Sequence, residues 1–233
     1  MKIVTSISPN RTGRQQYCIN SWKKYGYEII ALQPPSQVES TKTAFPDITV
    51  IECTNTGISL DKPYHVQIHE HIKLATQYND TILLINSDIE MIYSIDEFSY
   101  WTTVQESNFR IGIRWNHIER EANLCPYGID AFQITPQIAS ILPNLGFVIG
   151  CPHWDYWIVY ALMQHNYHII VNKSMRLFHE IHQERWSKTD YENTAALFDT
   201  NHKINSIQLS KVIANITGRG RYIASLKRKK VLV

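Results

Sequence analysis

The sequence predicts an α/β protein with a mixed, mostly parallel central sheet and helices on both of its faces. Along the first ninety residues, strand patterns alternate with helical patterns, as in proteins built from strand–helix–strand units. Residues 81–90 begin as an almost uninterrupted apolar run, which indicates a strand buried on both faces. With 233 residues and 44% hydrophobic residues, the chain can bury a sizeable core.

Local patterns place the elements of the first half. A strand is expected at residues 2–8, and the cluster of Pro9, Asn10 and Gly13 ends it before a helix at 14–25. The elements that follow are strands at residues 27–32 and 48–52, a helix at 65–78 and the apolar strand at 81–90.

The second half continues the same alternation. The expected elements are a helix near residues 95–106, strands at 109–115 and 129–135, helices at 136–142 and 153–164, and a strand at 168–177. Pro136 suits the first position of a short helix, because the amide that it lacks would have no partner there.

The charge is unevenly distributed. Residues 219–233 contain six basic residues and no acid, which leaves 17 basic and 21 acidic residues elsewhere. We expect residues 216–233 to be a basic tail, or a linker to further domains beyond the C-terminus. A net charge of +2 does not indicate a nucleic-acid partner.

Cysteine usage and hydropathy suggest the compartment. Cys18, Cys53, Cys125 and Cys151 are scattered without a Cys-x-x-Cys pair, which disfavours a zinc knuckle and a disulfide framework. The N-terminus lacks a signal-peptide core, and no apolar run has bilayer-spanning length. We therefore expect a soluble, cytoplasmic protein without a transmembrane segment.

Polar residues end the apolar strand. Asn86, Asp88 and Glu90 alternate, so on one continuous strand they would share a face. Ligands of open α/β sheets bind beyond the carboxyl ends of the strands, and such oxygen ligands suit Mg²⁺ or Mn²⁺. The alternative is a helix cap or a solvated loop, where Asp and Asn are also common.

Asp155 is a candidate general base. It lies in the first turn of the helix expected at residues 153–164, where the helix dipole favours its charged form, while the surrounding aromatic residues favour its neutral form. Opposed effects of this kind can tune a carboxylate for proton transfer. The alternative is a first-turn Asp without a chemical role.

Two histidines follow the last expected strand. His179 and His182 are three residues apart, so they point to opposite faces of a strand and meet at one site only if the chain turns there. His179, nearest the strand end, is the preferred ligand. A structural role is the alternative for a single histidine.

These three pieces, in this order, resemble glycosyltransferases of the GT-A fold, and the resemblance spans about residues 1–182. Asn86-Ser87-Asp88 resembles a variant of their Asp-x-Asp motif, Asp155 falls where inverting members place the base, and His179 matches their late histidine. In size the chain is similar to small bacterial and large-DNA-virus enzymes of this type. The resemblance implies one Rossmann-like domain at residues 1–215.

The resemblance also implies an activity and its residues. A sugar would pass, with inversion, from a UDP- or GDP-sugar to a hydroxyl of a glycan acceptor, with Mn²⁺ or Mg²⁺ held by Asp88 and His179 and with Asp155 as base. The residues implied to contact the nucleotide sugar are Thr5, Ser6, Arg11, Gln33, Lys73, Asn86, Ser87, Arg114 and Asp130. The aromatic residues that could stack on sugar rings, or otherwise pack in the core, are Trp115, Trp154, Tyr156, Trp157 and Trp186.

The chain departs from the motif at its first position. Asn86 can keep a hydrogen bond but supplies no charge, so Asp88 becomes the principal metal ligand and Glu90 the weakest candidate.

Three other functions remain open. A nucleotidylyltransferase is expected to carry a Gly-rich basic loop after the first strand, and residues 8–13 contain one Gly. A metal-dependent hydrolase could use His65, His69 and His71 with Asp88, although no Glu follows His65 as in zinc proteases. A nucleotide-sugar-binding protein without catalysis is the third.

Overall fold

A computed structural model describes residues 1–8, 11–92, 101, 104–105, 107–118, 121–182, 186–202, 211 and 231–232. Its centre is a sheet with the strand order β11-β10-β8-β9-β6-β1-β2-β3, in which β7 pairs with β10 outside this path. The strands are β1 (Lys2–Thr5), β2 (Glu28–Gln33), β3 (Thr49–Glu52), β6 (Ile82–Ile85), β7 (Ile89–Ile92), β8 (Asn108–Ile118), β9 (Glu121–Ile134), β10 (His168–Glu180) and β11 (Val231–Leu232).

The sheet is mostly parallel, as the sequence predicts. Along the main path only β9 runs against its neighbours, pairing antiparallel with both β6 and β8. The strand β7 is also antiparallel to β10. The parallel strands β1, β2, β6, β8 and β10 therefore end at one edge of the sheet.

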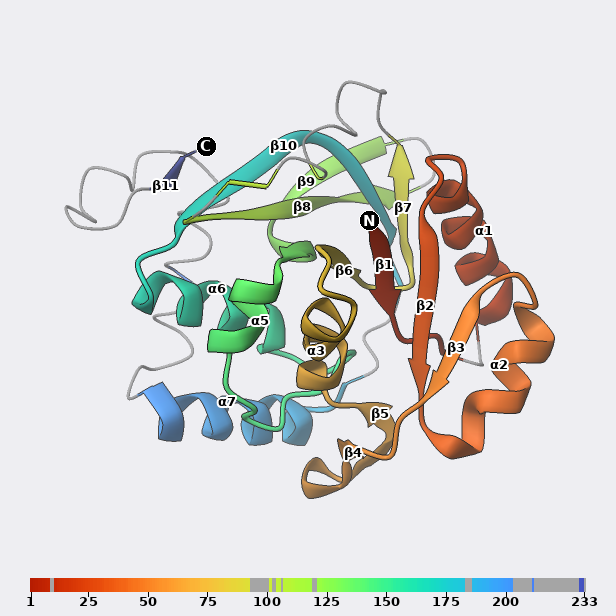
Figure 1. Ribbon diagram of the computed structural model, residues 1–233, viewed down its shortest axis with the longest axis horizontal. Coiled ribbons are helices and arrows are strands. Elements are labelled where there is room, and N and C mark those ends of the chain that lie inside the picture. Colours follow the sequence, from red (N-terminus) through yellow and green to blue (C-terminus); the bar gives the residue numbers. More distant parts are fainter. Residues whose placement is uncertain are drawn as a thin grey trace.

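Helices cover both faces, which confirms the predicted fold class. They are α1 (Thr12–Lys23), α2 (Val38–Ala44), α3 (Ile68–Tyr78), α5 (Pro136–Ile141), α6 (Trp154–Gln164) and α7 (Lys188–His202). In Figure 1, α3, α5 and α6 lie in front of the sheet, and α1 and α2 lie beside β2 and β3. A small second sheet of β4 (Thr56–Gly57) and β5 (Lys62–Val66), joined by the 3₁₀ helix η3 (Ile58–Leu60), lies below them, near α7. A further 3₁₀ helix, η2 (Pro35–Gln37), precedes α2.

The apolar runs form strands because both of their faces are buried. Ile82 and Leu84 of β6 join the core cluster beneath α3, α5 and α6, whereas Leu83 and Ile85 join the cluster beneath α1. Successive side chains of a strand point to opposite faces, so a strand between two helical layers needs an apolar residue at every position.

The predicted strand at residues 81–90 is wrong in its second half. The strand β6 ends at Ile85, a turn follows in which the Ile89 amide donates to the Asn86 carbonyl (3.2 Å), and β7 begins as a separate strand. The turn lets Ile89 and Met91 pack against α1, where the Met91 amide donates to the Ser21 hydroxyl (3.0 Å). Asn86, Asp88 and Glu90 therefore share no strand face.

Other differences are local. Residues 62–66 form β5 and not the start of α3, because that strand pairs with β4. The helix expected near residues 95–106 lies mostly outside the described residues. The helices α2 and α7 and the β4–β5 sheet were not predicted from the sequence. Within the described residues, no helix combines the length and hydrophobicity needed to span a bilayer.

Candidate active site

A cavity of about 830 Å³ opens at the edge where the parallel strands end. Ten of the residues implied by the resemblance line it: Ser6, Arg11, Gln33, Asn86, Ser87, Asp88, Arg114, Asp130, Asp155 and His179. Two others do not. Thr5 is fully buried, and Lys73 of α3 lies outside the lining, where it pairs with Glu70 at 2.9 Å.

One carboxylate and two imidazoles converge in this cavity. The Asp88 Oδ2 atom lies 3.4 Å from His179 Nε2 and 3.2 Å from His182 Nε2. The antiparallel pairing of β7 with β10 sets His179 opposite Ile89, the residue after Asp88. Because β10 ends at Glu180, the chain can turn and bring His182 to the same point.

The three side chains fit a divalent metal ion. Their ligand atoms all lie within 4.8 Å of one another. Burial alone would raise the pKa of the Asp88 carboxyl, but the hydrogen bonds and charges of His179 and His182 outweigh it and hold the pKa below its ordinary value. A set of two imidazoles and one carboxylate suits Mn²⁺ and other transition ions better than Mg²⁺, which prefers oxygen ligands. The sequence did not decide whether His182 is a metal ligand, and the only feature that indicated it was its spacing of three residues from His179.

Asp130 explains why residue 86 is an Asn. The antiparallel strand β9 places Ala131 opposite Ile85, so Asp130 lies beside Asn86. The Asn86 side-chain amide donates to Asp130 Oδ1 at 2.7 Å, and its backbone amide donates to the Asp130 carbonyl at 3.3 Å. An Asp at position 86 would set two carboxylates against each other. Asn86 therefore holds Asp130 in place.

Arg114 reaches the other oxygen of Asp130. Its Nη1 atom lies 3.5 Å from Asp130 Oδ2, and the charge of Asp130 raises the pKa of the guanidinium further. Gly128 makes this approach possible, since a Cβ there would lie 2.5 Å from Arg114 Nε and 2.6 Å from its Cγ. Asn86, Asp130 and Arg114 thus form one connected polar wall of the cavity.

Asp155 enters the cavity from the N-terminus of α6. Its neighbours Trp154 and Trp157 are buried in the core, where Trp154 packs against Phe132 with ring centroids 5.2 Å apart. Burial, assisted by the negative charge of Asp130, raises the pKa of Asp155 to about 7. Of the two opposed effects that the sequence indicates for Asp155, burial therefore outweighs the helix dipole in setting its pKa.

The residue that precedes α6 is held in a strained conformation. His153 has φ 73° and ψ −14°, in the left-handed region that costs a residue with a Cβ about 1–2 kcal/mol. Contacts from α7 hold it there: its Nδ1 atom lies 2.9 Å from Thr194 Oγ1, and its ring centroid lies 4.5 Å from that of Tyr191. Such strain is common where surrounding packing positions a functional group, here Asp155.

The opposite end of the cavity is polar and firmly hydrogen-bonded. Gln33 Nε2 donates to the Ile7 carbonyl (2.7 Å) and to Thr41 Oγ1 (2.9 Å), which fixes its buried side chain at the end of β2. The Ser6 hydroxyl lies 2.8 Å from His71 Nε2. Burial lowers the pKa of His71 to about 4, so this imidazole is neutral at pH 7 and its contact with Ser6 is structural.

The arrangement does not form the hydrolase centre considered from the sequence. His65 is on β5 and His69 on α3, so they do not share one helix face. His71 is engaged with Ser6 and with the Gln67 carbonyl at 3.0 Å. Within the described residues, the group of possible metal ligands is Asp88, His179 and His182.

Comparison with known proteins finds similarity only at the level of solved structures. No protein-family model matches the chain, and no curated protein sequence matches it. One similar structure is described as a glucose-1-phosphate thymidylyltransferase of Bacillus anthracis in complex with sucrose; it has 9% identity and a TM-score of 0.48, with 84% of this chain and 94% of that chain covered. Another is described as a nucleotide-diphospho-sugar transferase of Desulfovibrio desulfuricans, with 12% identity, a TM-score of 0.46, and 92% and 98% covered. Neither similarity bears on the activity of this chain.

Proposed function

We propose that the protein is a metal-dependent glycosyltransferase that moves a sugar from a nucleoside-diphosphate sugar to an acceptor hydroxyl, with inversion. One observation carries the proposal: Asp155, whose pKa is raised to about 7, lines the same cavity as the convergent group of Asp88, His179 and His182. A carboxylate of this kind suits the removal of a proton from a hydroxyl at neutral pH.

Asp88, His179 and His182 would hold the ion, with Mn²⁺ favoured over Mg²⁺. When bound, a divalent ion supplies positive charge that stabilises the departing diphosphate. Arg114 contributes a fixed positive charge on the polar wall, and Ser6, Arg11, Gln33 and Ser87 would contact the nucleotide at the polar end.

Asp155 would act on the acceptor. Its carboxylate accepts the proton of the attacking hydroxyl, and direct attack on the anomeric carbon from the side opposite the diphosphate inverts that carbon. Asp130 is engaged on the wall of the cavity, since its Oδ1 atom accepts a hydrogen bond from Asn86 and its Oδ2 atom lies 3.5 Å from Arg114 Nη1.

Asp155 also favours this reaction over nucleotidylyl transfer. A sugar phosphate that attacks a nucleoside triphosphate is already an anion and needs no base. An acceptor hydroxyl has to lose a proton and therefore needs one.

The test is calorimetry and product analysis on the purified chain. UDP and GDP are titrated with and without Mn²⁺, and UDP- and GDP-sugars are then assayed for release of nucleoside diphosphate. Asp88→Ala should remove the Mn²⁺-dependent part of nucleotide binding. Asp155→Asn should keep that binding and stop transfer.

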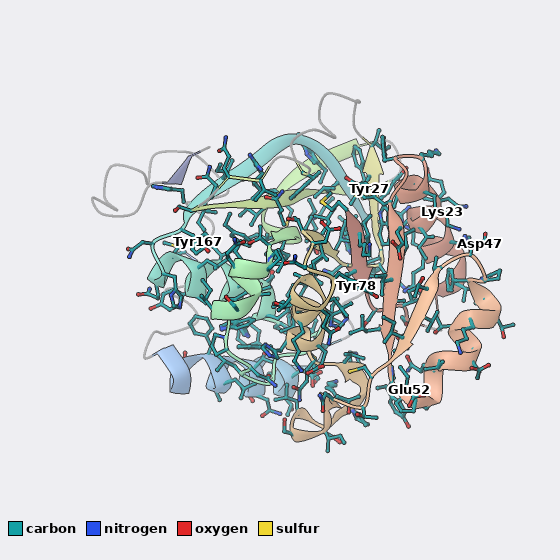
Figure 2. The ribbon with its side chains drawn as sticks, in the orientation of Figure 1. Lys23, Tyr27, Asp47, Glu52, Tyr78 and Tyr167 are labelled. Atoms are coloured by element: carbon teal, nitrogen blue, oxygen red, sulfur yellow. The ribbon has the colours of Figure 1, made fainter. Side chains whose placement is uncertain are left out.

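The matched control is Asp47→Ala, since Asp47 lies at the outer edge of the molecule beside Lys23, 3.2 Å from it (Figure 2). It should change neither property. Absence of Mn²⁺-dependent binding of either nucleotide would overturn the proposal. Release of pyrophosphate from a nucleoside triphosphate and a sugar phosphate would show nucleotidylyl transfer instead.

A further inference from the structure

The helix α1 contacts the residues on either side of Asp88. The hydroxyl of Ser87 lies 3.1 Å from the side-chain amide of Gln15. The indole Nε1 of Trp22 donates to the Ile89 carbonyl at 2.8 Å. Gln15 and Trp22 are two helical turns apart, so both side chains leave the same face of α1, which runs beside β7 in Figure 1. Both chain neighbours of this metal ligand are therefore held by one helix.

The same helix contacts the residues on either side of His179. Arg14 Nη2 donates to the Phe178 carbonyl at 3.5 Å, and Arg14 Nε lies 3.5 Å from Glu180 Oε2. Arg14 and Gln15 are adjacent in the first turn of α1, which begins at Thr12. This turn therefore joins the end of β10 to the segment that carries Asp88.

Gln15 is buried at the edge of the cavity. It is 3% exposed and belongs to the cavity lining. In the orientation that satisfies both ends of its amide, the nitrogen donates to the Ser8 carbonyl (2.7 Å), and the oxygen accepts from the Ser8 amide (3.0 Å) and from the Ser87 hydroxyl (3.1 Å). The two bonds to Ser8 fix the plane of the amide, and the third reaches Ser87. Gln15 therefore ties the chain after β1 to the turn after β6.

We propose that Gln15 is a positioning residue of the metal site, which acts through Ser87 to hold Asp88 where its carboxylate and the two histidines can meet one ion. The proposal rests on the metal site of the proposed function. If the turn at Ser87 and Asp88 were free, binding of an ion would have to order it, and the loss of backbone freedom would weaken binding. The hydrogen bond from Ser87 to Gln15 orders the turn beforehand.

The test is a double-mutant cycle in which Mn²⁺ affinity is measured by calorimetry without nucleotide. Gln15→Met keeps the length of the side chain and removes its hydrogen bonds, and it should raise the dissociation constant for Mn²⁺ about tenfold. Ser87→Ala should raise the constant by a similar factor. The double variant should bind no more weakly than either single variant, since both substitutions remove the same hydrogen bond. A role in stability alone would shift urea unfolding and leave the Mn²⁺ affinity of the folded protein unchanged.

The matched control is Gln16→Met, the same substitution one residue along the helix. Gln16 makes a solvent-exposed hydrogen bond to Asn20 (3.0 Å) and lies outside the cavity lining, so its replacement should leave the constant unchanged. An unchanged constant for Gln15→Met or for Ser87→Ala would overturn the inference, as would a loss of about a hundredfold in the double variant, which would show that the two side chains act independently. If Gln15→Met protein does not fold, Ser87→Ala decides alone, because it removes the same hydrogen bond from the other side.

Failure of the inference is distinguishable from failure of the proposed function. If the parent protein and Gln15→Met bind Mn²⁺ equally well, the inference fails while the proposed function stands. If the variants lose Mn²⁺ affinity as expected but the parent releases no nucleoside diphosphate from UDP- or GDP-sugars, the proposed function fails while the inference stands. A parent protein that binds no Mn²⁺ overturns both.

Discussion

Replacing Asp155 by Asn should make the protein more stable at neutral pH. Folding raises the pKa of this carboxyl from 3.8 to about 7, because burial and the charge of Asp130 both oppose its ionisation. Below pH 4 the group is protonated in the folded and the unfolded state and has no effect on stability. Between pH 4 and pH 7 only the unfolded state releases the proton, so stability is lost as the pH rises.

The magnitude follows from the two pKa values. Each pH unit between them contributes about 1.4 kcal/mol, so ionised Asp155 lowers the free energy of unfolding by up to about 4 kcal/mol above pH 7. One side of Asp155 faces the solvent of the cavity, so we expect between about 1 and 4 kcal/mol. Asn has the same shape and no charge to release, which removes this loss.

Urea unfolding of both proteins, without metal, measures the effect at pH 5, 6, 7 and 8. The stability advantage of Asp155→Asn should grow from pH 5 to pH 7 and then level off, while Asp47→Asn shows no such trend. A stability difference that is independent of pH, or a variant less stable than the parent at pH 8, would refute the reasoning. In the assay of transfer, the activity of the parent protein should rise with pH through about 7 as the base ionises.

Three further substitutions test the geometry around this base. Asn86→Asp should lower the free energy of unfolding by about 1–3 kcal/mol, since two carboxylates then meet. Adding Asp130→Asn should restore most of this loss. A double variant no more stable than Asn86→Asp alone would contradict the contact between residues 86 and 130. Gly128→Ala should lower the free energy of unfolding by about 1–3 kcal/mol through overpacking, and it should weaken nucleotide binding by displacing Arg114. An unchanged free energy of unfolding and an unchanged nucleotide affinity by calorimetry would show that Arg114 does not need the space beside residue 128. His182→Ala should raise the dissociation constant for Mn²⁺ by about tenfold or more, measured by calorimetry, and an unchanged constant would exclude it as a ligand.

Much of the site could be predicted because parallel strands impose a common edge. Ser6, Gln33 and Asn86 follow or end β1, β2 and β6, three adjacent parallel strands, so recognising each strand was enough to bring them together. The position of Asp155 in the first turn of a helix could likewise be predicted from the residues around it. Lys73 was predicted to reach the nucleotide only from its position on a helix, and it does not line the cavity but pairs with Glu70.

The contacts that define the chemistry of the site could not be predicted from local sequence patterns. Glu90 is absent from the cavity lining, because the chain turns after β6 and starts β7; the partner of that strand, β10, lies some ninety residues away in the sequence. The same pairing decides that His182 joins His179 at Asp88. The role of Asn86 depends likewise on Asp130, which only the antiparallel strand β9 brings to it.

The sequence by itself determined the alternation of strands and helices, the doubly buried sheet and the edge at which polar residues gather, because hydrophobic periodicity acts over a few neighbouring residues. Only the tertiary structure decided which polar groups touch: Asn86 with Asp130, both histidines with Asp88, and α7 with the strained start of α6. Those contacts join segments separated by tens of residues, and the burial of their apolar neighbours selects them.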